Sequence, residues 1–228
     1  MQIQRVEIKG EGFAIPGVMI TPRKVIGAAV IAHGYGGCKE EQLGLAWRVA
    51  EQGLVACAID LRGHGEHRLP LDENVLDDME AAVDFCRKFG RVVAIGHSLG
   101  GRLAMMSGAD NAIGVSPPTD RTYSEKTQET LRKLRHNKVR ADRENKVFDI
   151  LKEMPEWQRD DRRTLIVYGS RDVPEIVAAC DELRKNGANA VRIEGALHGD
   201  TYLMEAAYVS IARQLEEWFD IERPFTDR

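Results

Sequence analysis

The sequence lacks a long hydrophobic run, a paired cysteine motif and a strong excess of charge. No apolar stretch in the 228 residues approaches the roughly 18 needed to cross a bilayer, so we expect no membrane span. The net charge of −4 gives the chain no electrostatic reason to bind nucleic acid. The N-terminus has no basic start followed by an apolar core, so no secretory signal is predicted. We therefore expect a soluble, cytoplasmic protein.

Cysteine is scarce and scattered. Cys38, Cys57, Cys86 and Cys180 form no Cys-x-x-Cys pair, so reduced thiols are expected, as in the cytosol. Cys38 lies beside a predicted catalytic loop, where we interpret it as a bystander. No set of His, Cys and carboxylate residues has zinc-like spacing. The sequence predicts neither a metal nor a cofactor.

The chain does contain an alternation of short apolar runs and helical patterns. Residues 2–9 and 13–20 flank a Gly-Glu-Gly turn and predict an antiparallel hairpin. Later runs are apolar at consecutive positions, as in parallel strands covered on both faces, and span residues 28–32, 55–59, 92–95, 113–115, 165–168 and 190–193. Helical patterns accompany these runs at 42–52, 73–89, 175–185 and 201–219. This order predicts a single α/β domain over residues 1–228, with a mostly parallel sheet and helices on both faces.

One segment interrupts the alternation. Residues 118–162 have no strand signal and are rich in charged and helix-forming residues. A structureless loop of this length is unusual in a compact domain, so we predict a helical cap, or lid, over the C-terminal edge of the sheet. The alternative is a solvated helical excursion with no role at a site.

The run at 92–95 leads directly into the pattern Gly-x-Ser-x-Gly at residues 96–100, and a helical pattern follows. A serine in such a tight strand-to-helix turn presents its hydroxyl on a strained backbone. The pattern on its own could be an ordinary glycine-rich turn. Its context favours a nucleophile elbow, with Ser98 as the nucleophile of acyl-transfer chemistry.

A serine hydroxyl needs a base, and the base needs an orienting acid. His198 follows the last predicted strand, where a loop can reach over the sheet edge; a plain surface histidine is the alternative. Asp172 follows a strand and a glycine turn, in the expected position between serine and histidine. Asp172 could instead cap the next helix. Asp200 is too close to His198 in sequence to support it easily, and Asp181 falls within a helix.

The developing oxyanion needs fixed donors. The backbone N–H of Leu99 begins the helix after the serine, and the glycine-rich loop at 33–37 supplies a second donor, for which we choose the N–H of Tyr35. Gly34 and His97 are predicted to contact substrate, with the His97 side chain directed away from the serine. The alternative for the loop is a turn with a purely geometric role.

Five motifs occur in the order found in serine hydrolases of the α/β-hydrolase fold, and they lie at residues 33–37, 60–65, 96–101, 169–172 and 197–199. The chain resembles the small esterases, lipases and thioesterases of this family over nearly its whole length. The resemblance implies a Ser98–Asp172–His198 triad with an oxyanion hole from Tyr35 and Leu99. In such proteins the segment at 60–65 is mainly structural, so we interpret its Asp, Arg and His as a network that fixes the loop. That segment continues with Glu66, where relatives often have serine, and the predicted cap matches no family motif.

The predicted cap is basic: residues 131–146 include seven Lys or Arg and two acidic residues. If this patch borders the site, Arg132, Arg135 and Arg140 would bind substrate phosphate or carboxylate groups. We hypothesise a carboxylesterase for short or medium acyl chains, and an acyl-coenzyme A thioesterase as the alternative. A solvated helix with internally paired charges is the simpler explanation of the patch. A noncatalytic binding protein on the same fold is a distant third possibility.

Overall fold

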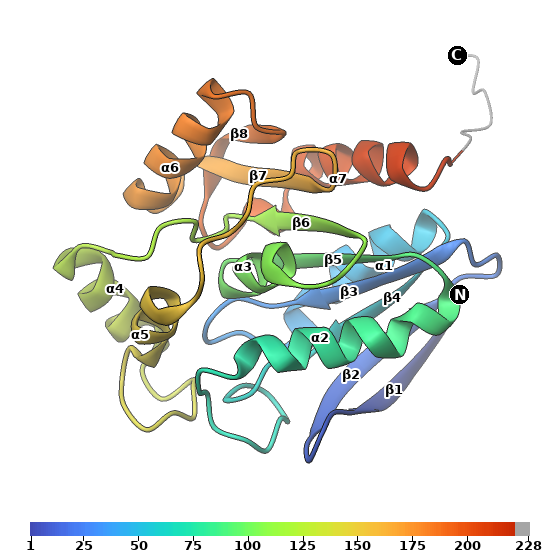
Figure 1. The fold of residues 1–228 in the computed structure, drawn as a ribbon, viewed down its shortest axis with the longest axis horizontal. Coiled ribbons are helices and arrows are strands. Elements are labelled where there is room, and N and C mark those ends of the chain that lie inside the picture. The colour runs from blue at the N-terminus through green and yellow to red at the C-terminus, as the bar shows by residue number, and fades with distance from the viewer. Residues whose placement is uncertain (222–228) are drawn as a thin grey trace.

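The computed structural model describes residues 1–221, and its strands form one continuous sheet (Figure 1). The strand order across the sheet is β1-β2-β4-β3-β5-β6-β7-β8. The strands are β1 Gln2–Lys9, β2 Ala14–Thr21, β3 Gly27–Ala32, β4 Leu54–Ile59, β5 Val92–His97, β6 Asn111–Val115, β7 Thr164–Arg171 and β8 Ala190–Leu197. Each predicted apolar run therefore lies within a strand.

The sheet is mostly parallel. β1 and β2 form the predicted antiparallel hairpin, and β2 also pairs antiparallel with β4. All remaining neighbours, from β4 through β8, pair in parallel. The hairpin turn includes Gly12 at φ 81°, a backbone conformation that glycine adopts without strain. The predicted α/β-hydrolase arrangement is confirmed.

Helices cover both faces of the sheet, and short 3₁₀ turns join them. The helical elements are η1 Lys39–Gln42, α1 Leu43–Glu51, α2 Val75–Cys86, η2 Arg87–Phe89, α3 Leu99–Met106, α4 Glu125–Arg135, α5 Lys146–Glu153, α6 Pro174–Lys185, η3 Thr201–Leu203 and α7 Glu205–Trp218. α1 and α7 share one apolar cluster with the sheet, while α2 and α3 pack into the cluster on the other face. The helix predicted over residues 201–219 is divided between η3 and α7.

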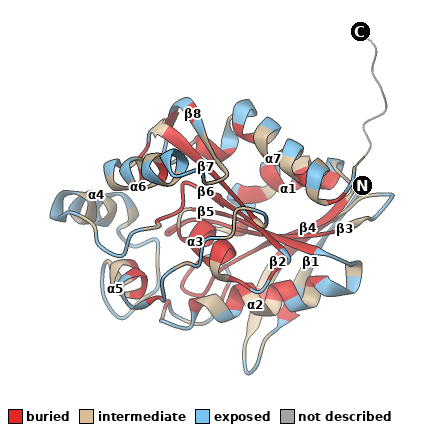
Figure 2. Cartoon of the chain, turned by 45° about the horizontal axis from the view of Figure 1, so that its top comes forward, coloured by how far each residue is buried: buried red, intermediate tan, exposed pale blue. Residues whose placement is uncertain are grey.

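The central strands are buried on both sides, which explains their uninterrupted apolar sequences. Every residue of β3, β4 and β5 is buried, and Figure 2 shows this buried layer running through the middle of the molecule. No helix within residues 1–221 is both long and apolar enough to cross a membrane. The parallel strands end at one edge of the sheet, and Ser98, Asp172 and His198 directly follow the ends of β5, β7 and β8.

Residues 118–162 contain α4 and α5, which lie together at the end of the molecule away from the N-terminus (Figure 1). α5 inserts Val147, Ile150 and Leu151 into the main core, whereas α4 buries none of its residues. A backbone bridge pairs Leu71 with Ala141 and ties the segment between the two helices to the body. The segment is thus helical and anchored mainly through α5.

Candidate active site

Ser98 occupies the turn between β5 and α3. Its backbone has φ 51° and ψ −118°, an uncommon conformation for a residue with a side chain. The flanking glycines are sterically required: a Cβ at Gly96 would lie 2.1 Å from the carbonyl carbon of Gly100. A Cβ at Gly100 would lie 2.5 Å from the carbonyl oxygen of Ala32. The motif therefore lets the turn pack closely against β3 while the serine is held in strain.

The structure brings Ser98, His198 and Asp172 into one hydrogen-bonded chain. Ser98 Oγ lies 3.0 Å from His198 Nε2, and His198 Nδ1 lies 2.6 Å from Asp172 Oδ1. A carboxylate only accepts, so the Nδ1–H of the imidazole donates to Asp172 and leaves Nε2 free to accept the serine proton. The three residues follow β5, β7 and β8, so the parallel topology places them at one sheet edge.

Asp172 is positioned to orient the imidazole of His198. Its side chain is fully buried, and its Oδ1 also accepts the backbone N–H of Val173 at 2.6 Å. Burial alone would raise the pKa of this carboxyl, but the hydrogen bond and positive charge of His198 outweigh it, so the pKa lies below its ordinary value. Asp172 is therefore ionised at neutral pH and stabilises an imidazolium at His198. The competing carboxylate of Asp181 instead pairs with Tyr168 and Arg192.

His97 is buried beside the nucleophile but its hydrogen bond goes elsewhere. Its Nε2–H donates to the backbone carbonyl oxygen of His198 at 2.7 Å. The ring lies between those of His198 and Tyr202, with centroids 4.9 and 4.7 Å away. Burial, and then the nearby charge of His198, lower the pKa of His97 to about 3, which keeps it neutral. It lines the cavity, and its hydrogen bond supports the loop that carries His198.

The loop after β3 approaches the serine closely. A Cβ at Gly34 would lie 2.9 Å from His97 Nδ1 and 3.1 Å from Ser98 Cβ, so only glycine fits there. Gly37 N–H donates to Gly34 O at 3.0 Å and closes the turn. Within residues 1–221 no acceptor takes the N–H of Tyr35, and the N–H of Leu99 begins α3, where no intrahelical acceptor exists. These two amides have the character required of oxyanion donors.

The His33 side chain connects this loop to the segment that follows β4. Its Nε2 accepts the N–H of Leu61 at 3.2 Å, and its Nδ1–H donates to Gly34 O at 2.8 Å. Burial lowers the pKa of His33 to about 4. His64 lies beside it, with the rings 4.9 Å apart, and burial followed by the effect of His33 lowers its pKa to about 3. Both imidazoles therefore stay neutral and structural.

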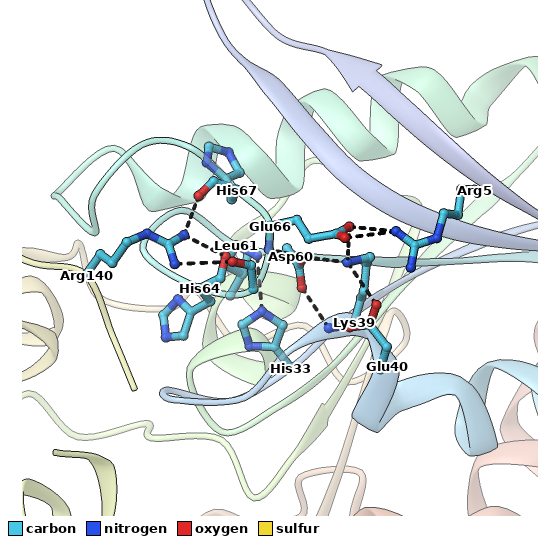
Figure 3. Close-up of polar contacts among 11 residues, drawn as sticks. Arg5, His33, Lys39, Glu40, Asp60, Leu61, His64, Glu66, His67 and Arg140 are labelled. Atoms are coloured by element: carbon cyan, nitrogen blue, oxygen red, sulfur yellow. Dashed lines mark hydrogen bonds and ion pairs between the residues drawn. The ribbon is translucent and has the colours of Figure 1, made fainter. Parts of the chain in front are cut away.

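A buried ion pair connects the loop at 33–37 to the segment at 60–66 (Figure 3). Lys39, with 1% of its side chain exposed, bonds through Nζ to Asp60 at 2.7 Å and Glu66 at 2.8 Å. Asp60 also accepts the backbone N–H groups of Lys39 and Glu66. Arg5 completes the chain at the surface with a 2.8 Å contact to Glu66. The segment acts as the loop-fixing network that the sequence suggested, with Lys39 as an unanticipated centre.

A cavity of about 400 Å³ opens beside Ser98. Most of its lining is apolar, and the segment at 118–162 and α6 contribute Tyr123, Leu131, Val147, Phe148, Leu151 and Ile176, together with the charged Lys126, Arg135 and Glu175. Ser98, His198, Gly34 and Tyr35 also line it. The cavity thus pairs an apolar chamber with reactive residues.

The three basic residues predicted to bind substrate occupy different surroundings. Arg132 is exposed and lies 3.5 Å from Glu144. The Arg140 guanidinium donates to the carbonyl oxygens of His64, Gly65 and His67, and it does not line the cavity (Figure 3). Arg135 is the one of the three that lines the cavity with Ser98. Arg140 therefore fastens the segment to the body.

Two residues that line the cavity, Tyr123 and Ile176, and one that lies behind His97, Tyr202, were not anticipated from sequence. Tyr123 and Ile176 form part of the apolar lining, and Tyr202 packs on His97. The sequence could have indicated Ile176, because it belongs to the helix that begins directly after Asp172, and the start of that helix must lie near the site. Tyr123 and Tyr202 have no local pattern that distinguishes them from core aromatics.

Comparison with known proteins identifies the family. The alpha/beta hydrolase family model matches residues 29–143, half of the chain, and the chain belongs to this family. The structure of the Pyrococcus furiosus esterase Pf2001 has a TM-score of 0.70 at 17% identity, over 96% of this chain and 92% of that one. A Pyrobaculum calidifontis esterase gives 0.66 at 18% identity, over 97% and 86%. Est1E from Butyrivibrio proteoclasticus gives 0.66 at 18% identity, over 96% and 99%.

These structural similarities, at such low identity, concern the fold. No curated protein sequence matches the chain.

Proposed function

We propose that the protein is a serine hydrolase that cleaves carboxylic esters of short or medium acyl chains. The observation that carries the proposal is the continuous chain from Ser98 Oγ through His198 to the ionised Asp172, at 3.0 and 2.6 Å. Its position at the mouth of an apolar chamber supports an ester with a hydrocarbon acyl group. Family membership is consistent with hydrolysis.

In the proposed reaction, Ser98 Oγ attacks the ester carbonyl while its proton passes to His198 Nε2. The N–H groups of Tyr35 and Leu99 stabilise the oxyanion, and Asp172 stabilises the imidazolium. His198 then protonates the departing alkoxide, which leaves as the alcohol and gives an acyl-enzyme on Ser98. Water attacks the acyl-enzyme with His198 again as base, and the carboxylic acid and the free serine are formed.

We further propose that residues 118–162 serve as a cap. The support is positional: α4 and α5 contribute Leu131, Leu134, Val147, Phe148 and Leu151 to the cavity that Ser98 lines. Such a lining sets the length of acyl chain that can be buried, because each methylene that fits contributes about 0.8 kcal/mol. The limited volume of about 400 Å³ favours short or medium chains.

The test is turnover of a series of neutral esters with acyl chains of increasing length. We expect kcat/KM to rise by roughly fourfold per methylene while the chain fits, and then to level off or fall. The Ser98→Ala variant should hydrolyse none of them. Absence of turnover across the series by the native protein, or full activity of Ser98→Ala, would contradict the proposal.

Acyl-coenzyme A thioesters are a second candidate because of the basic segment at 131–146. Much of that charge is internally paired: Lys133 contacts Glu129, and Arg143 contacts Asp149. This pairing favours the simple ester. Matched oxygen esters and coenzyme A thioesters of one acyl group decide between them, and a preference for the thioester in both rate and binding would favour the second candidate.

A further inference from the structure

Arg135 is the last residue of α4 and lies directly on the loop that carries Tyr35. A Cβ at Gly36 would lie 2.6 Å from Arg135 Cδ and 3.3 Å from Nε, so the arginine stem covers this glycine. Gly36 has φ 77°, which brings the backbone close to the arginine without a side chain between them. The guanidinium is thereby held within the walls of the active-site cavity.

This guanidinium has no anionic partner in the described part of the chain. Its Nε is buried and has no hydrogen-bond acceptor, and no carboxylate within residues 1–221 lies within ion-pair distance of it. Its neighbours in the basic segment differ, since Arg132, Lys133, Arg143 and Lys146 each contact a carboxylate. A half-buried, permanently charged group without a partner is unfavourable unless something else supplies the charge complement.

Arg135 also separates two hollows. On one side is the cavity with Ser98, and on the other is a hollow of about 290 Å³. The second hollow is lined by Tyr35, Arg132, Arg135, His136, Asn137, Val139, Ala141, Arg143, Glu144 and Asn145. Of its three arginines, Arg132 contacts Glu144 and Arg143 contacts Asp149, so Arg135 is the arginine of this lining that lacks a carboxylate partner in residues 1–221. Arg135 and the apolar residues of the cavity thus belong to one lining, which also includes Ser98.

We propose that Arg135 recognises an anionic group on the alcohol portion of the substrate. This rests on the proposed esterase function, in which the acyl chain occupies the apolar chamber and the alcohol extends past Tyr35. The substrate would be an ester whose leaving alcohol carries a carboxylate or a phosphate, both of which match the planar donor set of a guanidinium. Binding would supply the anionic partner that this guanidinium lacks in residues 1–221.

The test compares three esters with one acyl group: propyl hexanoate, 2-carboxyethyl hexanoate and 2-phosphoethyl hexanoate. The native protein should show a kcat/KM about 10- to 100-fold higher for a charged ester than for the neutral one, the range expected for a hydrogen-bonded charge pair. The better of the two charged esters identifies the anion. In Arg135→Gln the ratio of charged to neutral ester should fall close to one.

Lys133→Gln is the matched control. Lys133 lies on the same helix, pairs with Glu129 and lines neither hollow, so its loss removes the same charge from the protein without touching the site. This variant should keep the native preference. Equal rates of the native protein on all three esters would overturn the proposal, and so would an equal drop in the ratio in both variants.

Binding of hexyl phosphate, measured by calorimetry, separates this proposal from the esterase function. We expect binding at least 10-fold weaker in Arg135→Gln than in the native protein or in Lys133→Gln. Hydrolysis of propyl hexanoate without any preference for anions would refute only the role of Arg135. Failure to hydrolyse any of the three esters would refute the esterase function, while equal binding of hexyl phosphate by all three proteins would again refute anion recognition.

Discussion

The Nε2–H of His97 donates to the backbone carbonyl oxygen of His198 over 2.7 Å, and the two imidazole rings lie 4.9 Å apart. The residue before Ser98 thus holds the loop that carries His198. His97 is neutral because burial lowers its pKa to about 3, so it can hold this loop without placing a second positive charge beside the imidazolium.

His97→Phe should lower kcat by about 10- to 100-fold with little change in KM, because the ring is retained while the anchor of the His198 loop is lost. His97→Gln keeps an N–H donor and should recover part of the rate. Steady-state kinetics on a neutral ester provide the measurement. A larger effect on KM than on kcat, or no recovery by the glutamine, would contradict a positioning role.

Asp172→Asn should lower kcat by roughly 10⁴-fold, since an amide N–H at this position favours the imidazole tautomer that cannot accept the serine proton. Asp181→Asn serves as the control because that carboxylate pairs with Tyr168 and Arg192. It should keep near-native kcat. More than a tenth of native activity in Asp172→Asn would show that a different acid orients His198.

Lys39→Met should destabilise the fold by about 3–5 kcal/mol, because it leaves the fully buried carboxylate of Asp60 without its counter-charge. Arg5→Met removes the exposed end of the same network and should destabilise the fold far less, because solvent screens that pair. Urea unfolding at neutral pH measures both. Similar losses in the two variants would mean that burial does not set the strength of this network.

The free energy of unfolding should fall as the pH drops below 6.5, because three buried histidines stay neutral in the folded protein. The pKa values of His33, His64 and His97 are lowered from 6.5 to about 4, 3 and 3, so the unfolded chain takes up protons that the native one does not. Their contribution is complete above pH 6.5 and is lost on acidification, by about 2 kcal/mol for each histidine at pH 5.

Urea unfolding at pH 7 and pH 5 tests this dependence. His136→Gln is the control, because that imidazole is exposed beside Glu144 and its loss should leave the difference between the two pH values in place. Equal stability of the native protein at pH 7 and pH 5 would show that the three imidazoles are not buried in the neutral form.

The sequence alone predicted the features of the fold that depend on a local pattern of residues. Consecutive apolar residues mark strands that are covered on both faces, and glycines around Ser98 mark the turn that only they can form. The topology then brings together residues at the ends of β5, β7 and β8. For that reason Ser98, Asp172 and His198 could be selected from sequence before their distances were known.

The sequence did not reveal where long side chains point. Arg132, Arg135 and Arg140 look equivalent along the chain, yet one pairs with Glu144, one lines the cavity and one donates to three carbonyl groups. The burial of Lys39 likewise depends on contacts with Asp60 and Glu66, which are more than 20 residues away. Such choices are set by packing between distant segments, and no local pattern records them.

The most direct test of the account is to treat the protein with a fluorophosphonate and map the adduct by peptide mass. Tryptic cleavage after Arg91 and Arg102 gives a peptide of residues 92–102 in which Ser98 is the only serine. We predict one adduct, on this peptide, that is absent in Ser98→Ala and forms much more slowly in His198→Gln. An unlabelled native protein, or labelling that persists in Ser98→Ala, would contradict the claim that Ser98 is an activated nucleophile.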